Sequence, residues 1–284
     1  MTTDRLIALG SGRSLFARQT GSGSDVVLLH GALTTSHDWE ASPLTALGRR
    51  HRLTIVDRPG HGNSERPRLA GTPRDQARQI LAGLDAFGLE RPLVVGHSFG
   101  AMIALAMAEE RPAGLAGLVL VAPLAFPEPR LLEHRLLAPM SVPLFGDMLS
   151  WAAERAPFGR TMVRAVQRLM FDPAPVPAAW QASFPFDDIL RKRSIVAEGE
   201  DSASMLPFAP AGTIDLSRIR LPVHVLTGTA DRIVEDERQG KALARLLPQA
   251  ELTEIEGAGH MLHHSHPAAV QRAILAMTDA RAAA

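Results

Sequence analysis

Four short runs of apolar residues constrain the fold of this chain more than any other feature. They are "DVVLLHG" (25–31), "RLTIVD" (52–57), "PLVVGH" (92–97) and "GLVLVAP" (117–123). Continuous apolar runs of this length are typical of strands that are buried on both faces, as in a parallel sheet. After the second run, Thr72, Pro73 and Asp75 form a helix start signal. The alternation predicts right-handed strand–helix–strand units in an open α/β sheet.

The alternation is interrupted in the second half of the chain. Between residue 126 and about residue 210 no strand is evident, and this stretch holds 11 of the 21 prolines and nine of the 13 aromatic residues. Strands resume with "PVHVLTGTAD" (222–231) and "AELTEIEG" (250–257). Near the start of the chain, "SLFARQT" (14–20) is expected to pair antiparallel at the sheet edge. Because long structureless loops are uncommon in compact domains, we predict a helical insertion. The predicted domains are a core (1–125 and 211–284) and a helical cap or lid (126–210).

A pentapeptide at the end of the third run suggests nucleophilic catalysis. Gly96-His97-Ser98-Phe99-Gly100 fits G-x-S-x-G, with an apolar strand before it and a helical pattern after it. This context is that of a nucleophile elbow, in which a serine occupies a sharp strand-to-helix turn and small glycines make room for the crowded backbone. The simpler alternative is a serine that only caps a helix. The strand and the helix favour the elbow, so Ser98 is the predicted nucleophile.

An elbow serine requires a base and an acid that orients the base, and both should follow later strands of the same sheet. Asp231 follows "VHVLTG", and His260 lies in the loop after "LTEIEG". The chain order Ser98, Asp231, His260 is the order expected for an elbow serine. Should Asp231 not be the acid, Glu235 and Asp236 are the nearest substitutes.

The first apolar run ends in a turn that can complete this site. His30-Gly31-Ala32-Leu33 follows the strand, and its backbone can face the serine. We expect the N–H groups of Ala32 and Phe99 to form the oxyanion hole, which stabilises the charge that develops on the carbonyl oxygen. The N–H group of Leu33 is the alternative to that of Ala32, because the sequence does not determine the conformation of this turn.

Taken together, the motifs resemble those of the α/β-hydrolase fold superfamily, in its cap-bearing group of small serine esterases, haloperoxidase-like perhydrolases and carbon–carbon-bond hydrolases. The matching segments are "HGA" (30–32), "DRPGHGNS" (57–64), "GHSFG" (96–100), "GTADRIV" (228–234) and "GAGHMLHHSHP" (257–267). The resemblance implies a mostly parallel eight-stranded sheet with helices on both faces. It also implies that "DRPGHGNS" is a structural turn in which Asp57 and Ser64 hold the backbone. Ser265 stands where the family has a glutamate, outside the predicted triad.

The serine narrows the reaction. Epoxide hydrolases and haloalkane dehalogenases on this fold use aspartate at the elbow, and this chain has no tyrosine of the kind found in epoxide hydrolase caps. Serine favours acyl transfer through an acyl-enzyme, so we predict a carboxylesterase-like hydrolase of apolar or aromatic, small to medium esters. Three alternatives stay open: a carbon–carbon hydrolase with Arg191 or Arg193 holding a substrate acid, a perhydrolase or haloperoxidase-like enzyme, and a ligand-binding or accessory protein.

The substrate pocket is expected to be lined by cap residues together with Leu33. An aromatic-rich lid suits an apolar ligand, and some of these side chains are expected to pack the cap onto the core instead. The candidates are Phe126, Phe145, Met148, Trp151, Phe171, Trp180, Phe184 and Phe186.

Composition excludes several other functions. Thirty basic and 30 acidic residues give a formal net charge of zero, which argues against a nucleic-acid surface or a polybasic membrane anchor. The absence of cysteine excludes disulfides and thiolate ligands. No cofactor is expected, and no metal, because His260, His263, His264 and His266 lack an accompanying carboxylate motif. With no secretory signal or membrane span evident, we expect a soluble cytoplasmic protein with a small-molecule substrate, and a homodimer stays open.

Overall fold

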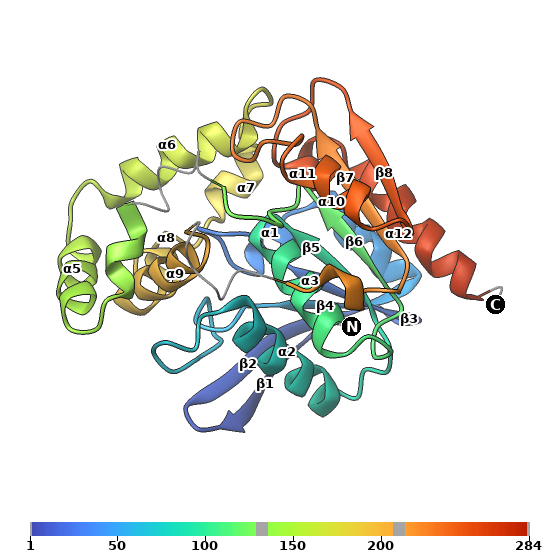
Figure 1. The fold of residues 1–284 in the computed structure, drawn as a ribbon. Coiled ribbons are helices and arrows are strands. Elements are labelled where there is room, and N and C mark those ends of the chain that lie inside the picture. Colours follow the sequence, from blue (N-terminus) through green and yellow to red (C-terminus); the bar gives the residue numbers. More distant parts are fainter. Residues whose placement is uncertain (1, 129–135, 207–213, 283–284) are drawn as a thin grey trace.

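The computed structural model describes residues 2–128, 136–206 and 214–282 of the chain. Eight strands form one sheet in the order β1-β2-β4-β3-β5-β6-β7-β8 (Figure 1). Strands β3 to β8 run parallel to their neighbours, and β1 and β2 add an antiparallel hairpin beside β4. The predicted mostly parallel, eight-stranded α/β sheet is therefore confirmed. The strands are β1 (Thr2–Gly10), β2 (Arg13–Thr20), β3 (Ser24–Leu29), β4 (His51–Val56), β5 (Leu93–His97), β6 (Gly117–Val121), β7 (Val223–Gly228) and β8 (Ala250–Ile255).

The sheet edge differs from the prediction. The segment 14–20 does pair antiparallel, as part of β2, but the edge strand is β1, which was not expected from the sequence. In β1 the half-buried residues Arg5, Ile7 and Leu9 alternate with exposed ones. This period-two pattern belongs to a strand with one face in water, and it lacks the continuous apolar run that identifies the central strands.

Alternate residues of the central strands fill two separate cores. In β3, Val27 and Leu29 belong to the core under α2 (Pro73–Phe87), α3 (Phe99–Glu110) and α10 (Gly240–Leu246). Val26 and Leu28 belong to the core under α1 (His37–Glu40), the short helix η1 (Pro43–Arg49) and α12 (Pro267–Ala282). Because successive side chains of a strand point to opposite faces, apolar residues at every position require helices on both faces.

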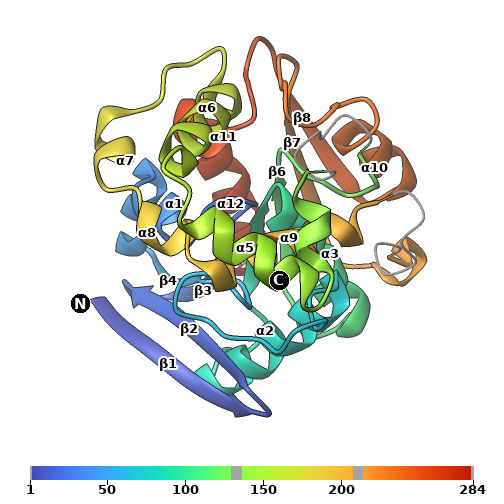
Figure 2. The ribbon, with the colours of Figure 1, turned by 90° about the vertical axis from the view of Figure 1, so that its left-hand side faces the viewer.

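A group of helices lies between β6 and β7 in the sequence. Figures 1 and 2 show this group gathered at one end of the sheet, and Gly12 at the tip of the β1–β2 hairpin lines a hollow together with Asp147 and Lys192 of this group. No strand occurs in its described part, residues 136–206. The predicted boundary at residues 210 and 211 lies outside the described residues. The helices are η2 (Ala138–Ser141), α5 (Phe145–Glu154), α6 (Gly159–Phe171), α7 (Ala178–Ala182), α8 (Phe186–Ile189) and α9 (Lys192–Ser204), and η4 (Leu216–Arg218) precedes β7.

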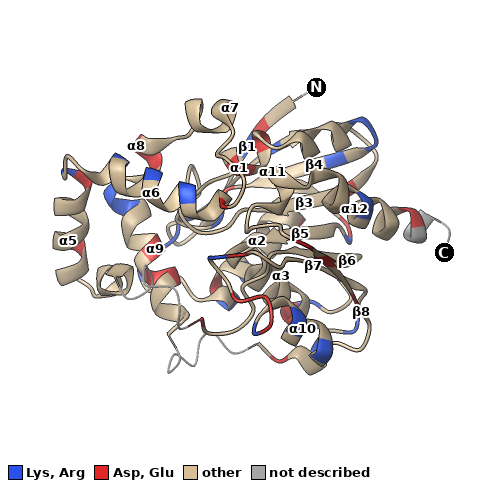
Figure 3. Ribbon diagram, turned by 90° about the horizontal axis from the view of Figure 1, so that it is seen from above, with Lys and Arg blue, Asp and Glu red and all other residues tan. Residues whose placement is uncertain are grey.

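Charged residues of both signs occur throughout the fold. Lysine and arginine residues are interspersed with aspartate and glutamate over most elements (Figure 3). Among the described residues, none of the helices combines the length and the apolar character that crossing a bilayer requires.

Candidate active site

Ser98 lies in a strained turn between β5 and α3. Its φ of 54° and ψ of −119° are sparsely populated for a residue with a side chain. The two flanking glycines are required by close backbone contacts. A Cβ on Gly96 would lie 2.5 Å from the carbonyl oxygen of Gly100, and a Cβ on Gly100 would lie 2.5 Å from that of Leu29. The backbone therefore has the geometry of a nucleophile elbow.

Asp231 and His260 meet at the carboxyl ends of β7 and β8. Nδ1 of His260 lies 2.7 Å from Oδ2 of Asp231, and both side chains are buried. Oδ1 of Asp231 accepts hydrogen bonds from the backbone N–H groups of Ile233 (2.8 Å) and Val234 (3.0 Å). These bonds fix the carboxylate, so Nδ1 of His260 donates and Nε2 is left as the basic nitrogen.

The two substitute acids are engaged elsewhere. Asp236 forms an ion pair with Lys241 at 3.1 Å. Glu235 lies near Arg238, with 3.8 Å between the charged atoms. Asp231 is thus the acid whose carboxylate contacts the His260 ring.

A cavity is lined by Ser98, His260 and the predicted oxyanion-hole residues Ala32 and Phe99. Its volume is about 30 Å³, enough for one or two water molecules. Oγ of Ser98 makes no hydrogen bond to the described residues, and such contacts often form only when substrate is bound. The cavity is lined by Ala32, Leu33, Ser98, Phe99, Leu124, Leu137, Val166, Met170, Glu198, Ser202, Ile233 and His260.

The backbone N–H groups at this cavity are not equivalent. The N–H groups of Ala32 and Phe99 make no backbone or side-chain hydrogen bond to the described residues. The N–H of Leu33 donates to Oε1 of Glu198 at 2.6 Å. Ala32 and Phe99 are therefore the residues with donors still available to an oxyanion, which favours Ala32 over Leu33.

The aromatic residues expected in the pocket lie elsewhere, and Leu33 is the expected pocket residue that does line the cavity. Phe145, Met148 and Trp151 are exposed on α5, with 51, 58 and 52% of their surface accessible. Trp180 and Phe184 are buried against each other, with ring centroids 4.9 Å apart. Aliphatic side chains form the apolar wall instead. The other three aromatic candidates, Phe126, Phe171 and Phe186, pack on the hydrophobic core.

Glu198 is the carboxylate that lines the cavity, and sequence reasoning missed it. Its carboxylate is 97% buried, since only 3% of the residue is exposed, and it comes from α9, more than 160 positions after the turn that it contacts. The helix carries three carboxylates within four residues, Glu198, Glu200 and Asp201, and all three are buried. Buried carboxylates need partners. The acid-rich sequence "AEGED" was therefore a usable signal, although it does not identify the partner.

Another buried carboxylate, Asp38, lies near His97, with 3.8 Å between Oδ2 and Nδ1. Asp38 accepts hydrogen bonds from Nε2 of His263 and Nε2 of His264 (both 2.9 Å) and from Nε1 of Trp180 (3.1 Å). Burial opposes ionisation of Asp38, but the two histidines hold its pKa well below the usual value. Burial lowers the pKa of His263 to about 4, and its Nδ1 has no hydrogen-bond partner. His263 is therefore a neutral donor.

His30 and His97 have a structural role at the site, as hydrogen-bond partners of backbone groups. Burial lowers the pKa of both rings well below the usual value. His97 donates through Nε2 to the backbone carbonyl of His260 at 3.3 Å, and Nε2 of His30 accepts from the N–H of Arg58 at 3.0 Å. Both histidines hold the backbone around the cavity.

The turn "DRPGHGNS" has the structural role that the resemblance implied. Asp57 accepts from the N–H groups of Ser36 and Asn63, both at 2.8 Å. Ser64 Oγ donates to the carbonyl of Asp57 at 2.6 Å and accepts from the N–H of Phe16 at 2.9 Å. These bonds connect the loop after β4 to β2 and to the region around α1.

Among the described residues, two groups of side chains offer three metal-ligating atoms within 4.8 Å: Asp38 with His97 and His263, and His61 with Glu198 and Asp201. In the first group the carboxylate already binds N–H donors, and in the second Asp201 binds Arg58 at 2.6 Å. A metal ion would have to displace these bonds, so neither group is arranged as a vacant coordination site.

Comparison with known proteins identifies a family and several relatives of this chain. The model of the "Alpha/beta hydrolase family" matches residues 26–273. The chain is 27% identical to "Non-heme chloroperoxidase" of Streptomyces lividans, over 95% of this chain and 98% of the relative. It is also 27% identical to "2-hydroxy-6-oxononadienedioate/2-hydroxy-6-oxononatrienedioate hydrolase" of Cupriavidus pinatubonensis, over 96% and 94%. The solved structure "Epoxide hydrolase CorEH without ligand" matches with a TM-score of 0.79 at 20% identity, over 98% of each chain, and this shows a shared fold.

Proposed function

The chain belongs to the alpha/beta hydrolase family, and from this premise we propose that it is a serine hydrolase that cleaves small esters through Ser98, His260 and Asp231. The observation that carries the proposal is the bond of 2.7 Å between His260 and Asp231 at the cavity that also contains the elbow serine. A histidine oriented by a fixed carboxylate is the base that a serine nucleophile requires.

The proposed reaction follows from these positions. Oγ of Ser98 attacks the ester carbonyl while Nε2 of His260 takes its proton, and the carbonyl oxygen becomes an oxyanion. The N–H groups of Ala32 and Phe99 stabilise that oxyanion. His260 then gives the proton to the leaving alcohol, which leaves an acyl-enzyme. Water, deprotonated by His260, attacks the acyl carbonyl and releases the acid and Ser98.

The cavity supports a small acyl group. A volume of about 30 Å³ favours a short acyl chain unless the surrounding side chains move. Its wall of Leu137, Val166 and Met170 is aliphatic, so apolar acyl groups suit it better than aromatic ones. Leu137, Val166, Met170 and Glu198 all belong to residues 126–210, which we propose as a cap that closes the site.

A carbon–carbon hydrolase for acid substrates is less well supported. Neither of the arginines considered for a substrate acid lines the cavity: Arg191 pairs with Asp188 at 2.6 Å, and Arg193 donates to the carbonyl of Gly62. The charged group that does line the cavity, Glu198, would repel an acid. Perhydrolysis uses the same triad. The similarity to "Non-heme chloroperoxidase" therefore makes perhydrolysis the second candidate function.

The proposal is tested with p-nitrophenyl esters of increasing acyl length, with wild type and Ser98→Ala side by side. We expect turnover to be highest for acetate or propionate and to fall steeply for longer chains. Ser98→Ala should lose about 10⁶-fold in kcat, as expected when a triad nucleophile is removed. Adding hydrogen peroxide and a halide acceptor tests the second candidate. Turnover that survives in Ser98→Ala would refute the mechanism, and no turnover of any ester would favour a binding protein.

A further inference from the structure

The acyl-transfer steps leave one charged group at the cavity without a role. Glu198 lines the same cavity as Ser98 and His260, yet it is neither nucleophile, base nor oxyanion donor. It is also buried, so its carboxylate is desolvated. A buried carboxyl group is costly unless it is hydrogen-bonded, and retaining one beside the reacting atoms points to recognition.

Only one of the two carboxyl oxygens is held by the protein. Oε1 accepts from the N–H of Leu33 at 2.6 Å and lies 3.1 Å from Nε2 of His61. Nδ1 of His61 lies 3.2 Å from the carbonyl of Pro59, which can only accept, so Nδ1 carries a proton. Oε2 of Glu198 makes no hydrogen bond to any of the residues that the structure describes.

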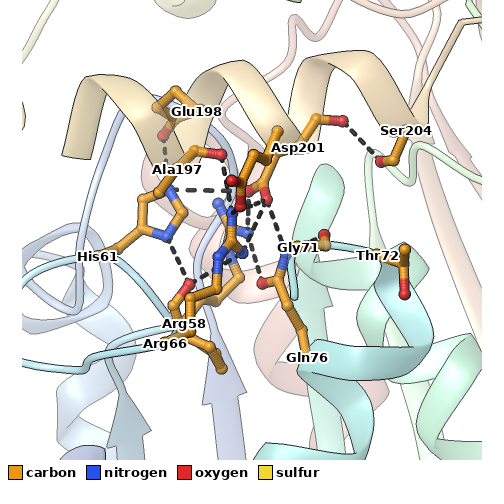
Figure 4. A network of polar contacts seen from close by, with 12 residues as sticks. Arg58, His61, Arg66, Gly71, Thr72, Gln76, Ala197, Glu198, Asp201 and Ser204 are labelled. Atoms are coloured by element: carbon orange, nitrogen blue, oxygen red, sulfur yellow. Dashed lines mark hydrogen bonds and ion pairs between the residues drawn. The ribbon is translucent and has the colours of Figure 1, made fainter. Parts of the chain in front are cut away.

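The position of Glu198 is rigid because α9 is tied to the core one turn later (Figure 4). Asp201 binds Arg58 at 2.6 Å, Arg66 at 3.0 Å and Nε2 of Gln76 at 2.7 Å. Although burial opposes ionisation, the two arginines lower the pKa of Asp201 to about 2, so this anchor stays charged. A carboxylate on such a helix cannot swing far, which preorganises it for a ligand.

Besides Glu198, the polar side chains that line the cavity are those of Ser98, Ser202 and His260, and the first and the last of these have roles in the proposed reaction. Most of the remaining wall is apolar, from Leu124, Leu137, Val166, Met170 and Ile233. An acceptor left without a donor in such surroundings costs about 1 to 3 kcal/mol. Water can supply the donor while the site is empty, but a substrate that fills a cavity of about 30 Å³ displaces it. The substrate should then supply the donor itself.

We propose that Glu198 is a specificity-determining residue that accepts a hydrogen bond from an O–H or N–H group carried by the substrate close to the scissile carbonyl. The inference rests on the proposed function and gives it a substrate class: small hydroxyacyl or aminoacyl esters. Their all-carbon isosteres leave Oε2 unpaired, and substrates with a carboxylate at the same place meet a second anion. Sites built for a hydroxyl group reject analogues that lack it by large factors.

The test compares four phenyl esters that differ at one position of the acyl group: glycolate, glycinate, propionate and the malonate half-acid. Each kcat/KM is divided by the ester's rate constant for hydroxide hydrolysis, which removes differences in intrinsic reactivity. For wild type we expect glycolate and glycinate to exceed propionate by about 10- to 100-fold, and malonate to be slowest. Equal values for glycolate, glycinate and propionate would overturn the inference while leaving the proposed function intact.

Glu198→Gln sharpens the comparison. The N–H of Leu33 should retain the amide oxygen, so the amide NH₂ takes the place of Oε2 and offers a donor instead of an acceptor. We expect the glycolate-to-propionate ratio to fall at least 10-fold and malonate to improve relative to propionate. An unchanged ratio would contradict the role of Glu198.

Glu200→Gln is the matched control. Glu200 is buried on the same helix and accepts from the N–H of Leu69 at 2.9 Å, but it lines a different hollow beside Arg66 and Arg68. Its variant should lose stability without changing the substrate ratio. Ser98→Ala reports separately on the proposed function, because turnover that survives in this variant would refute the mechanism whatever the substrate ratio. If wild type hydrolyses none of the four esters and no acetate ester, both statements are refuted.

Discussion

Two buried carboxylates each hold histidines near the cavity, and they differ in what the histidines face. Asp231 receives two backbone N–H bonds and directs one histidine, His260, at the cavity of Ser98. Asp38 receives three side-chain donors, from His263, His264 and Trp180. None of these four residues lines the cavity that contains Ser98. A carboxylate–histidine pair is thus a catalytic unit only where its far nitrogen faces a nucleophile. Elsewhere the same chemistry joins elements of the fold.

The largest difference between the two carboxylates is expected when Asp231 is replaced. Asp231→Asn should keep the fold, because the amide oxygen can still accept from Ile233 and Val234, but His260 then adopts the wrong tautomer. We expect kcat to fall about 10⁴-fold, with Tm nearly unchanged. Ester hydrolysis and a thermal melt on the same sample measure both. A kcat within tenfold of wild type would show that another group orients His260.

The matching change at Asp38 should have the opposite signature. Asp38→Asn leaves one oxygen for three donors and brings an NH₂ group against an N–H, so it should lower the free energy of unfolding by about 2 to 3 kcal/mol. Urea titration measures this loss, and kcat should stay within about tenfold of wild type. A large loss of kcat with full stability would place Asp38 in the chemistry instead.

The pH dependence of stability sharpens the difference. Burial lowers the pKa of His263 to about 4, whereas a histidine of the unfolded chain titrates near its ordinary value of about 6.5. Between these values the unfolded state binds the additional proton, so the free energy of unfolding falls as pH falls. His263 alone should account for about 2 kcal/mol between pH 7 and pH 5. Thermal melts across this range should show a weaker slope for His263→Gln, and an identical slope would contradict the assignment.

The smallest effect is expected at Trp180. Trp180→Phe keeps most of the aromatic packing and removes the Nε1 donor to Asp38, at a cost of about 1.5 kcal/mol. In a double-mutant cycle with Asp38→Asn the two losses should not add, because they share this bond. Full additivity would mean that the bond contributes nothing.

Much of the fold and of the candidate site could be predicted from the sequence because local patterns determine it. The buried strands have apolar residues at every position, and Gly96 and Gly100 are required by the crowded turn around Ser98. The positions of Asp231 and His260 follow from strand order. In contrast, the bond between Glu198 and Leu33 joins residues 165 positions apart. No local pattern identifies such a partner, and helix composition does not reveal that Phe145 and Trp151 on α5 are exposed instead of lining the cavity.

The attachment of the helices to the sheet limits how this protein can be engineered. Residues 138–204 reach the rest of the chain through specific polar pairs, among them Trp180 with Asp38 and Asp201 with Arg58. Transplanting this segment onto another scaffold, or exchanging it for a foreign one, would strand buried charges on both sides of the seam. Chimeras therefore have to include the core partners of these pairs together with the helices. The helical segment and its partners in the core have to be exchanged together.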